Sequence, residues 1–402
     1  MIDAITTSVL STGVFAVAAF YLIKRFAPDG RQEFNRYHAY YAASATLFGG
    51  FFLFFIIVAL KALMPSYHRL FDILNFFAPL AAAAAVCHSR RLLAEKKRAR
   101  YGFEKLAMLL LQLSACLAIL ITGGIVVSVA AESYRFFTLI PVNDFLFGME
   151  WSPQIAIREN QAGASGSFGL VPVMAGTFLI TVIAMLFAAP IGLASAVYLS
   201  EFADAKFRAR VKPVIELLAG VPTVVYGFFA VVTLSPILRA LGASIGVNIV
   251  GESALVAGIV MGVMLIPFIT SLSEDALFAV PISLRQGALA LGATRYEVAA
   301  QVIFPAALSG IVAGLLLAVS RAVGETMIVV MAAGISANLT INPLEAVTTV
   351  TVQIVSLLTG DQAFDDPKTL AAFALGLSLL LITLALNGAA MLAVRRFREH
   401  YE

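Results

Sequence analysis

An arginine and a glutamate stand inside one of the most apolar stretches of the sequence. Gly310 to Met331 is long enough to cross a bilayer as a helix, which takes roughly 20 apolar residues, and it carries Arg321 and Glu325 near its middle. Ionisable groups at this depth are costly, so they mark a functional-site hypothesis by default. Because the two residues are four apart, we expect their side chains to share a helix face and to pair.

The chemistry of this pair favours an anion. Arginine stays protonated and presents a planar fork that fits carboxylate or phosphate oxygens. An oxyanion could bind Arg321, while Glu325 balances the arginine when the path is empty. The competing interpretation is a buried ion pair that only locks the helices together.

A polar interruption precedes this helix. Residues 284–305 hold Arg285, Arg295 and Glu297 among small residues and end at Pro305. Gly292 stands between two short helix-like pieces and permits a tight turn. The pattern predicts two short helices with a projecting turn, an elbow outside the membrane that can receive a push. The alternative is an amphipathic connector.

The composition sets the class of protein. The chain has 402 residues, of which 60% are hydrophobic and only 13% are charged, whereas ordinary soluble domains are about 25% charged. The sequence therefore predicts an all-α integral membrane protein. Cys87 and Cys116 lie in apolar segments and the four histidines are scattered, so we expect no metal site, no bound cofactor and no disulfide framework.

Nine membrane spans are expected, and the distribution of Lys and Arg orients them. With the N-terminus outside and the C-terminus cytoplasmic, 20 of the 27 basic residues fall in cytoplasmic segments and 6 in external ones, as the positive-inside rule requires. The beginning Met1-Ile2-Asp3 lacks a basic signal region, so the first span is expected to be retained. The expected spans are 4–23, 41–60, 71–88, 106–131, 170–199, 213–238, 252–273, 309–333 and 369–393.

One of these spans and one stretch outside them carry irregular features. Gly220 and Pro222 at membrane depth predict a broken helix in 213–238, tolerated only against protein or a water-lined cavity. Thr223 and Tyr226 are its deeper polar groups and could line a path or make interhelical hydrogen bonds. The moderately apolar stretch 341–359 is expected to be an external or re-entrant helix.

Two domains are expected. Residues 1–105 form an N-terminal transmembrane extension that ends in a basic, lipid-facing cytoplasmic linker, and residues 106–402 hold six spans with a cytoplasmic loop at 274–308. No soluble domain accompanies the linker, so a nucleic-acid partner is not expected. The external loop 132–168 contains the only tryptophan, Trp151, and could be a docking surface or a tether.

Several stretches resemble the permeases of phosphate-specific ABC importers. The elbow resembles the family's EAA loop, in which Glu-Ala-Ala is followed after three residues by Gly and after nine more by Ile-x-Leu-Pro. Gln286-Gly287-Ala288, Gly292 and the run that ends at Pro305 occupy these positions, and the first two residues, the Ile and the Leu depart from the pattern. The other similar stretches are 198–202, 215–230, 288–295 and 320–327, the last resembling the PstC-type subunit more than its PstA-type partner.

The resemblance covers about 106–395 and carries expectations of its own. It implies a type I permease core of six helices, with about three extra N-terminal helices, in the bacterial inner membrane. It implies four kinds of contact: a second homologous permease, two ATP-binding-cassette subunits, a periplasmic phosphate-binding protein and membrane lipid. The residues expected to couple this chain to the ATPase are Gln286, Gly287, Ala288, Gly292 and Pro305. The residues expected to line the phosphate path are Arg321, Glu325, Thr326, Tyr226 and Thr223.

The implied function is phosphate import by alternating access. The sequence lacks the ATP-binding pattern G-x-x-x-x-G-K-[ST], so ATP is expected to be used by a partner subunit and this chain has no catalytic residues. Two alternatives stay open: a permease for another oxyanion such as sulfate or molybdate, and a membrane sensor or assembly subunit that transports nothing.

Overall fold

The computed structural model describes residues 99–155, 165–359 and 366–398. The spans expected at 4–23, 41–60 and 71–88 lie outside these residues. By its contacts the chain divides into two compact units, Met1–Gly124 and Ile125–Glu402. The expected boundary at residue 105 stays a prediction.

The regular secondary structure of the described residues is helical apart from one short hairpin. Three five- or six-residue π-helical segments, written η, interrupt the α-helices. The elements are α5 (Ala99–Leu139), α6 (Val142–Phe147), β1 (Trp151–Ile155), β2 (Ser165–Phe168), α7 (Leu170–Val197), η2 (Tyr198–Phe202), α8 (Ala205–Ala219), α9 (Thr223–Phe229), η3 (Ala230–Leu234), α10 (Ser235–Ser244), α11 (Ala254–Phe278), α12 (Ile282–Ala290), α13 (Arg295–Glu297), η4 (Val298–Ile303), α14 (Phe304–Val323), α15 (Met327–Ala332), α16 (Val350–Leu358) and α17 (Pro367–Arg398).

Six stretches of the described chain are long and apolar enough to cross a membrane. They are Ala107–Leu139, Leu170–Phe202, Thr223–Ser244, Ala254–Phe278, Arg295–Val323 and Pro367–Leu392. Helix α16 has nine residues, about 14 Å at 1.5 Å per residue, which is too short for a span. The expectation that 341–359 does not cross the membrane is therefore consistent with the structure.

The core of the second unit forms around α7 and α11, which pack tightly because small residues face bulky ones. A Cβ added at Gly258 of α11 would lie 2.5 Å from the Ile183 side chain of α7. Helix α14 also approaches α11 closely: a Cβ added at Gly310 would lie 2.7 Å from the Ala276 side chain of α11. Glycine at these positions lets the helix backbones approach closely, and the packed side chains then stabilise the contact through van der Waals interactions.

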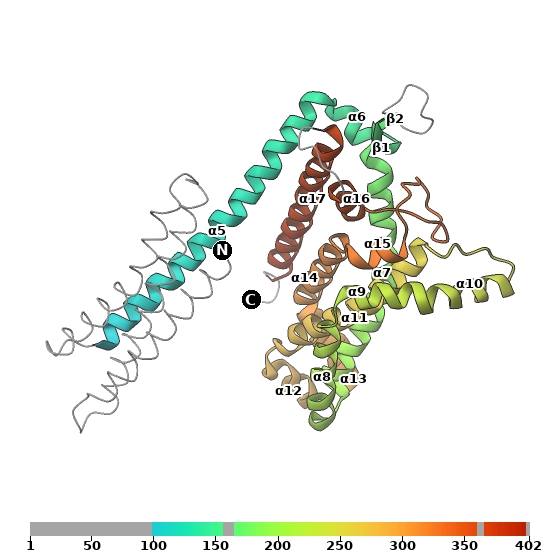
Figure 1. Cartoon of the computed structure of the whole chain (residues 1–402). Helices are drawn as coiled ribbons and strands as arrows, with labels where there is room; N and C mark the ends of the chain where they lie inside the picture. The colour runs from blue at the N-terminus through green and yellow to red at the C-terminus, as the bar shows by residue number, and fades with distance from the viewer. Residues whose placement is uncertain (1–98, 156–164, 360–365, 399–402) are drawn as a thin grey trace, which may run out of the picture. The chain divides into compact units, whose positions relative to one another are not determined.

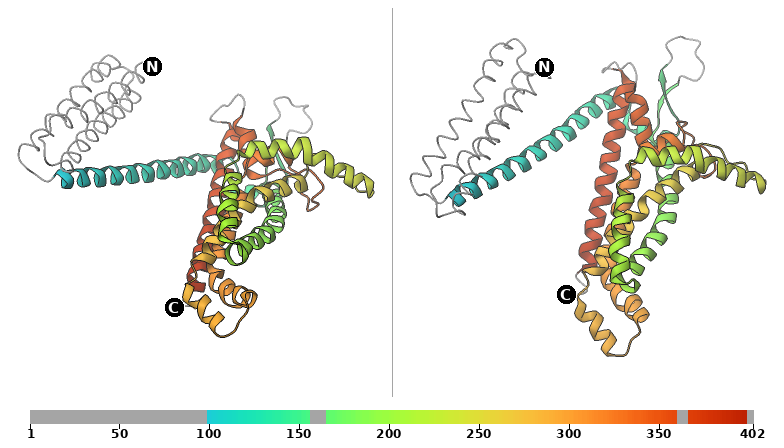
Figure 2. Two further views of the ribbon diagram at one scale, coloured as in Figure 1. Left: turned by 90° about the horizontal axis from the view of Figure 1, so that it is seen from below. Right: turned by 60° about the horizontal axis from the view of Figure 1, so that its bottom comes forward.

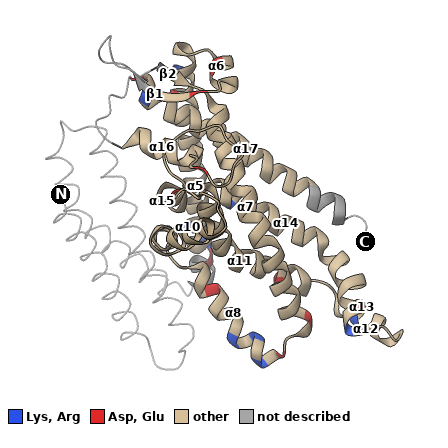
Figure 3. Ribbon diagram, turned by 90° about the vertical axis from the view of Figure 1, so that its right-hand side faces the viewer, with Lys and Arg blue, Asp and Glu red and all other residues tan. Residues whose placement is uncertain are grey.

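The two ends of the second unit differ. Figure 1 shows α6, β1, β2 and α16 at one end and α8, α12 and α13 at the other, with α7, α11 and α14 between them. The views in Figure 2 show the elbow α12–α13 projecting beyond the long helices. Figure 3 shows basic residues on α8 and on the elbow; they are Lys206, Arg208, Arg210 and Lys212 of α8, Arg285 of α12 and Arg295 of α13.

The loop 132–168 is more ordered than a tether. Helix α5 continues to Leu139, and β1 pairs antiparallel with β2, with Trp151 opposite Phe168. Trp151 is 8% exposed and meets Phe168 edge-on at 6.0 Å between ring centres. The tether interpretation is wrong for the described part of this loop, because these aromatic side chains fill a core.

Candidate functional site

The helix that carries Arg321 ends sooner than the sequence predicts. Helix α14 ends at Val323, Gly324 caps it, and α15 begins at Met327. The expected span 309–333 is thus two helices with a break at 324–326. Arg321 lies in the last turn of α14, and Glu325 lies in the break.

The expected pairing of Arg321 with Glu325 is wrong. The two residues do not share a helix, and no ion pair among the described residues joins them. The physical reason is local: Gly324 has a weak helix preference, and the next N–H, that of Glu325, bonds the Ala322 carbonyl three residues back and so departs from the α-helical pattern. Arg321 is exposed on this chain and its guanidinium lies 5.4 Å from the Phe268 ring centre of α11, a cation–π contact.

The break is held in place by its neighbours. The Glu325 N–H donates to the Ala322 carbonyl at 3.1 Å, and the Thr351 hydroxyl donates to the Glu325 carbonyl at 2.8 Å. The Thr326 hydroxyl lies 3.4 Å from the Gly324 carbonyl. These bonds satisfy backbone groups that a helix end leaves unpaired.

The second predicted break is confirmed. Helix α8 ends at Ala219 and α9 begins at Thr223, directly after Pro222. The Tyr226 hydroxyl donates to the Leu218 carbonyl at 3.0 Å, a carbonyl that also accepts from the Val221 N–H at 3.3 Å, so this tyrosine bridges the break. Thr223 is half-buried at the start of α9.

The two breaks are neighbours in space. Helix α9 packs against α15, where a Cβ added at Gly227 would lie 2.8 Å from the Met331 sulfur and 3.2 Å from the Met327 carbonyl oxygen. The structure thus brings the elements that carry Tyr226 close to the element that follows Glu325. No hydrogen bond among the described residues joins Tyr226 to Arg321.

The elbow has the shape that its sequence predicts. Gly292 has φ +89° and forms the turn between α12 and α13, although a Cβ there would meet nothing within 4 Å. Backbone conformation, not space, therefore requires glycine. Thr294 and Glu297 form a capping box that starts α13. Pro305 stands in the first turn of α14, a position that tolerates proline because the N–H it lacks is not needed there.

The elbow presents an exposed surface. Gln286 and Gly287 are exposed and Ala288 is half-buried against the core. Leu291 at the tip is 91% exposed and Tyr296 is 72% exposed. Large apolar side chains in such exposed positions fit a surface that a partner protein covers.

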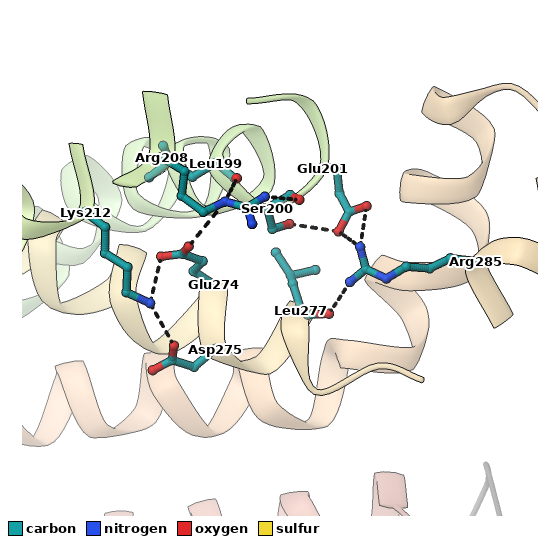
Figure 4. Close-up of polar contacts among 9 residues, drawn as sticks. All are labelled: Leu199, Ser200, Glu201, Arg208, Lys212, Glu274, Asp275, Leu277 and Arg285. Carbon is teal, nitrogen blue, oxygen red and sulfur yellow. Dashed lines mark hydrogen bonds and ion pairs between the residues drawn. The ribbon is translucent and has the colours of Figure 1, made fainter. Parts of the chain in front are cut away.

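Ion pairs tie the elbow to the rest of the unit, as Figure 4 shows. Arg285 of α12 places its Nη1 at 2.7 and 2.8 Å from the two carboxylate oxygens of Glu201 in η2, and its Nη2 donates to the Leu277 carbonyl of α11 at 2.7 Å. Arg285 and Glu201 are only 19% and 10% exposed. One arginine therefore joins three elements.

A neighbouring cluster joins α8 to α11 (Figure 4). Glu274 is 1% exposed; its Oε2 lies 3.3 Å from the Lys212 Nζ and its Oε1 lies 4.0 Å from the Arg208 Nε. Lys212 also bonds Asp275 at 3.2 Å. Burial opposes the charge of Lys212, but its hydrogen bond to Asp275 and the field of Glu274 together raise its pKa.

The residue-by-residue prediction missed Glu201 and Glu274. Glu201 pairs with Arg285, which is 84 residues away in the sequence. Glu274 pairs with Lys212, which is 62 residues away. A signal was present, because an acidic pair, Glu274-Asp275, ends an apolar span while a basic run, 206–212, lies in another segment on the same expected side. Opposite charges at the ends of packed helices favour pairing.

Comparisons with known proteins agree with this architecture. Residues 188–399 match the family "Binding-protein-dependent transport system inner membrane component". Two relatives are the probable ABC transporter permease protein YqgH of Bacillus subtilis, 32% identical over 67% of this chain and 84% of the relative, and the phosphate transport system permease protein PstC of Mesorhizobium japonicum, 30% identical over 70% and 87%.

The fold is also similar to that of a solved transporter. A chain of a bacterial alginate ABC transporter superimposes with a TM-score of 0.52 and 15% identity, covering 74% of this chain and 96% of that one. The comparison concerns the fold alone. Together with six apolar stretches of membrane length, the family match shows that this chain belongs to the inner membrane components of binding-protein-dependent transport systems, as the multi-pass permease subunit of an ABC importer.

Proposed function

We propose that this permease moves inorganic phosphate into the cytoplasm and that Arg321 binds the anion on its way. The observation that carries the proposal is an exposed arginine in the last turn of an otherwise apolar membrane helix, with no acidic partner among the described residues. An uncompensated cation at this depth is costly unless a ligand or a partner subunit meets it. Relatives that bear the name phosphate permease support phosphate as the anion.

Arg321 is well suited to bind a phosphate anion and to release it. Its guanidinium offers several N–H donors in one plane, which fits two oxygens of a phosphate at once. Stacking on Phe268 fixes the plane without consuming a donor. Glu325 is half-buried in the break two residues after the end of α14, and its negative charge opposes anion binding that is too tight.

Movement can reach this arginine through α11. The helix touches Arg321 through Phe268 and the elbow through the Leu277 carbonyl, two points about 14 Å apart along the axis at 1.5 Å per residue. A push on the elbow by an ATPase subunit would tilt α11 and shift the face beneath Arg321. This is alternating access by a rigid element, with Gln286, Gly287, Ala288, Gly292 and Pro305 shaping the surface that is pushed.

The remaining assignments belong to the same proposal. ATP is hydrolysed by two separate ATP-binding-cassette subunits, a second homologous permease completes the path, and a periplasmic phosphate-binding protein delivers the anion. Thr223, Tyr226 and Thr326 contribute polar groups beside the two breaks. The basic end of the second unit (Figure 3) supports an orientation with α8, α12 and α13 in the cytoplasm.

Anion competition tests the substrate. The chain is expressed with its partner subunits in cells that lack their own high-affinity phosphate system, and uptake of radiolabelled phosphate is measured with excess sulfate or molybdate. We expect uptake that neither anion reduces. Uptake that sulfate or molybdate abolishes would instead identify a permease for that oxyanion, and an assembled complex without any anion uptake would contradict the proposal.

A further inference from the structure

A buried polar network lies behind the break that carries Glu325. Its centre is the start of α16, where Thr349 and Thr351 are 3% and 6% exposed. Their hydroxyl oxygens lie 3.0 Å apart, and the Thr351 hydroxyl donates to the Glu325 carbonyl at 2.8 Å. Helix α16 is too short to cross the membrane.

Gln353 connects the same helix to two further segments. The Trp151 indole N–H donates to its Oε1 at 2.8 Å, and its amide nitrogen donates to the Ile335 carbonyl at 2.9 Å and to the Thr348 hydroxyl at 3.0 Å. Gln353 is 3% exposed. All of its hydrogen-bonding groups are therefore engaged, which specifies one orientation of the side chain.

The start of α16 cannot shift freely against α7. The Thr177 hydroxyl of α7 accepts from the Val350 N–H at 3.1 Å. Gly176 lies so close to the Thr348 carbonyl that a Cβ there would overlap it. The network thus links four places, namely α7, the β1–β2 hairpin, the chain after α15, and the break at Glu325, through one rigid turn of helix.

We propose that Thr351 and Gln353 are positioning residues that set the conformation of the break at 324–326 and transmit its state to Trp151 in the hairpin. A core that only needed filling would use apolar side chains, because each buried polar group must be satisfied at a cost. Here the bonds run between segments that are 26 and 202 residues apart, and one of them ends on the backbone of the proposed anion site. This role rests on the proposed transport function.

Trp151 provides a direct readout because it is the only tryptophan of the chain. The complete importer is measured in lipid discs with and without a non-hydrolysable ATP analogue. The spectrum of a Trp151→Phe complex is subtracted to remove the tryptophans of partner subunits. We expect a shift in the Trp151 emission when the nucleotide analogue binds, since a moving break would change the surroundings of the indole.

Thr351→Val removes the hydroxyl while keeping the shape of the side chain, and Thr351→Ser keeps the hydroxyl. We expect Thr351→Val to lose the emission shift and to reduce the maximal rate of phosphate uptake per assembled complex about tenfold, the size expected for one lost hydrogen bond in a moving element. Thr351→Ser should restore both. Thr359→Val is the matched control, because the exposed Thr359 bonds only carbonyls of its own helix.

The outcomes separate the two ideas. If the wild-type complex imports no phosphate, the proposed substrate fails, but the nucleotide-dependent emission still tests the network. An unchanged emission shift in Thr351→Val, with normal uptake per complex, would overturn the positioning role. A lower yield of complexes that are individually normal would overturn it too, because it would show that Thr351 serves folding alone.

Discussion

The ion pair between Arg285 and Glu201 should hold the elbow against the membrane helices. Arg285→Met removes the contacts to both Glu201 oxygens and to the Leu277 carbonyl. Breaking a fully buried pair costs about 3–5 kcal/mol, and hydrogen bonds to charged groups contribute about 1.5–3 kcal/mol. Because Arg285 is 19% exposed, water can reach the pair, and we expect a loss of about 2–3 kcal/mol in the free energy of local opening.

Hydrogen exchange of the assembled importer measures this quantity. Each 1.4 kcal/mol corresponds to a factor of about ten in an opening equilibrium, so amides of α12 should exchange roughly 30–150-fold faster in Arg285→Met. Arg295→Met is the control, because Arg295 is an exposed arginine of the same elbow that enters no ion pair among the described residues. Equal exchange of α12 in the wild type and in Arg285→Met would refute the anchoring role.

A double-mutant cycle isolates the pair from other effects. Glu201→Gln and Arg285→Met remove the same interaction, so the double variant should be less destabilised than the sum of the single variants. Both single variants should also weaken the stimulation of ATP hydrolysis by the loaded binding protein. Additive effects on local opening would show that the two side chains do not act together.

Three further predictions concern other parts of the unit. Gly292→Leu should uncouple ATP hydrolysis from transport, since φ +89° strains any side chain; unchanged stimulation of ATP hydrolysis would contradict this. Gly258→Val should lower the thermal stability of the complex by about 1–3 kcal/mol through overpacking between α7 and α11, and an unchanged melting temperature would oppose it. Asp275→Asn should lower the pKa of Lys212, because it removes a carboxylate that favours the protonated amine while burial still disfavours that charge. The rate of amine labelling as a function of pH measures this shift.

The sign of the Lys212 effect follows from its raised pKa. Protonated Lys212 stabilises the fold at every pH below its ordinary value of 10.5, and this contribution disappears only as the pH rises through the higher folded value. No loss from this group is therefore expected near neutral pH. Labelling of Lys212 that is equally fast in the wild type and in Asp275→Asn would contradict the assignment.

Features set by local sequence were predictable. The turn at Gly292 and the break at Gly220–Pro222 depend on the backbone limits of glycine and proline, and both occur where expected. Long apolar runs gave the membrane helices for the same reason, because length and composition are local properties.

Features that depend on packing were not predictable. A spacing of four residues brings Arg321 and Glu325 together only in a continuous helix. Helix α14 ends at Val323, directly before Gly324, so the two side chains do not pair. The bond from Trp151 to Gln353 spans 202 residues, and no periodicity in the sequence connects them. Family resemblance predicted the permease fold, whereas the partner of each buried charge became visible only in three dimensions.

Uptake of radiolabelled phosphate by complexes with Arg321→Gln tests the central claim most directly. The amide keeps much of the side-chain length but carries no charge, and Arg239→Gln on α10 serves as a control for an exposed arginine of this chain. With equal amounts of assembled complex, we predict that Arg321→Gln abolishes uptake and that Arg239→Gln does not. Wild-type uptake in Arg321→Gln would contradict the claim that this arginine binds the transported anion.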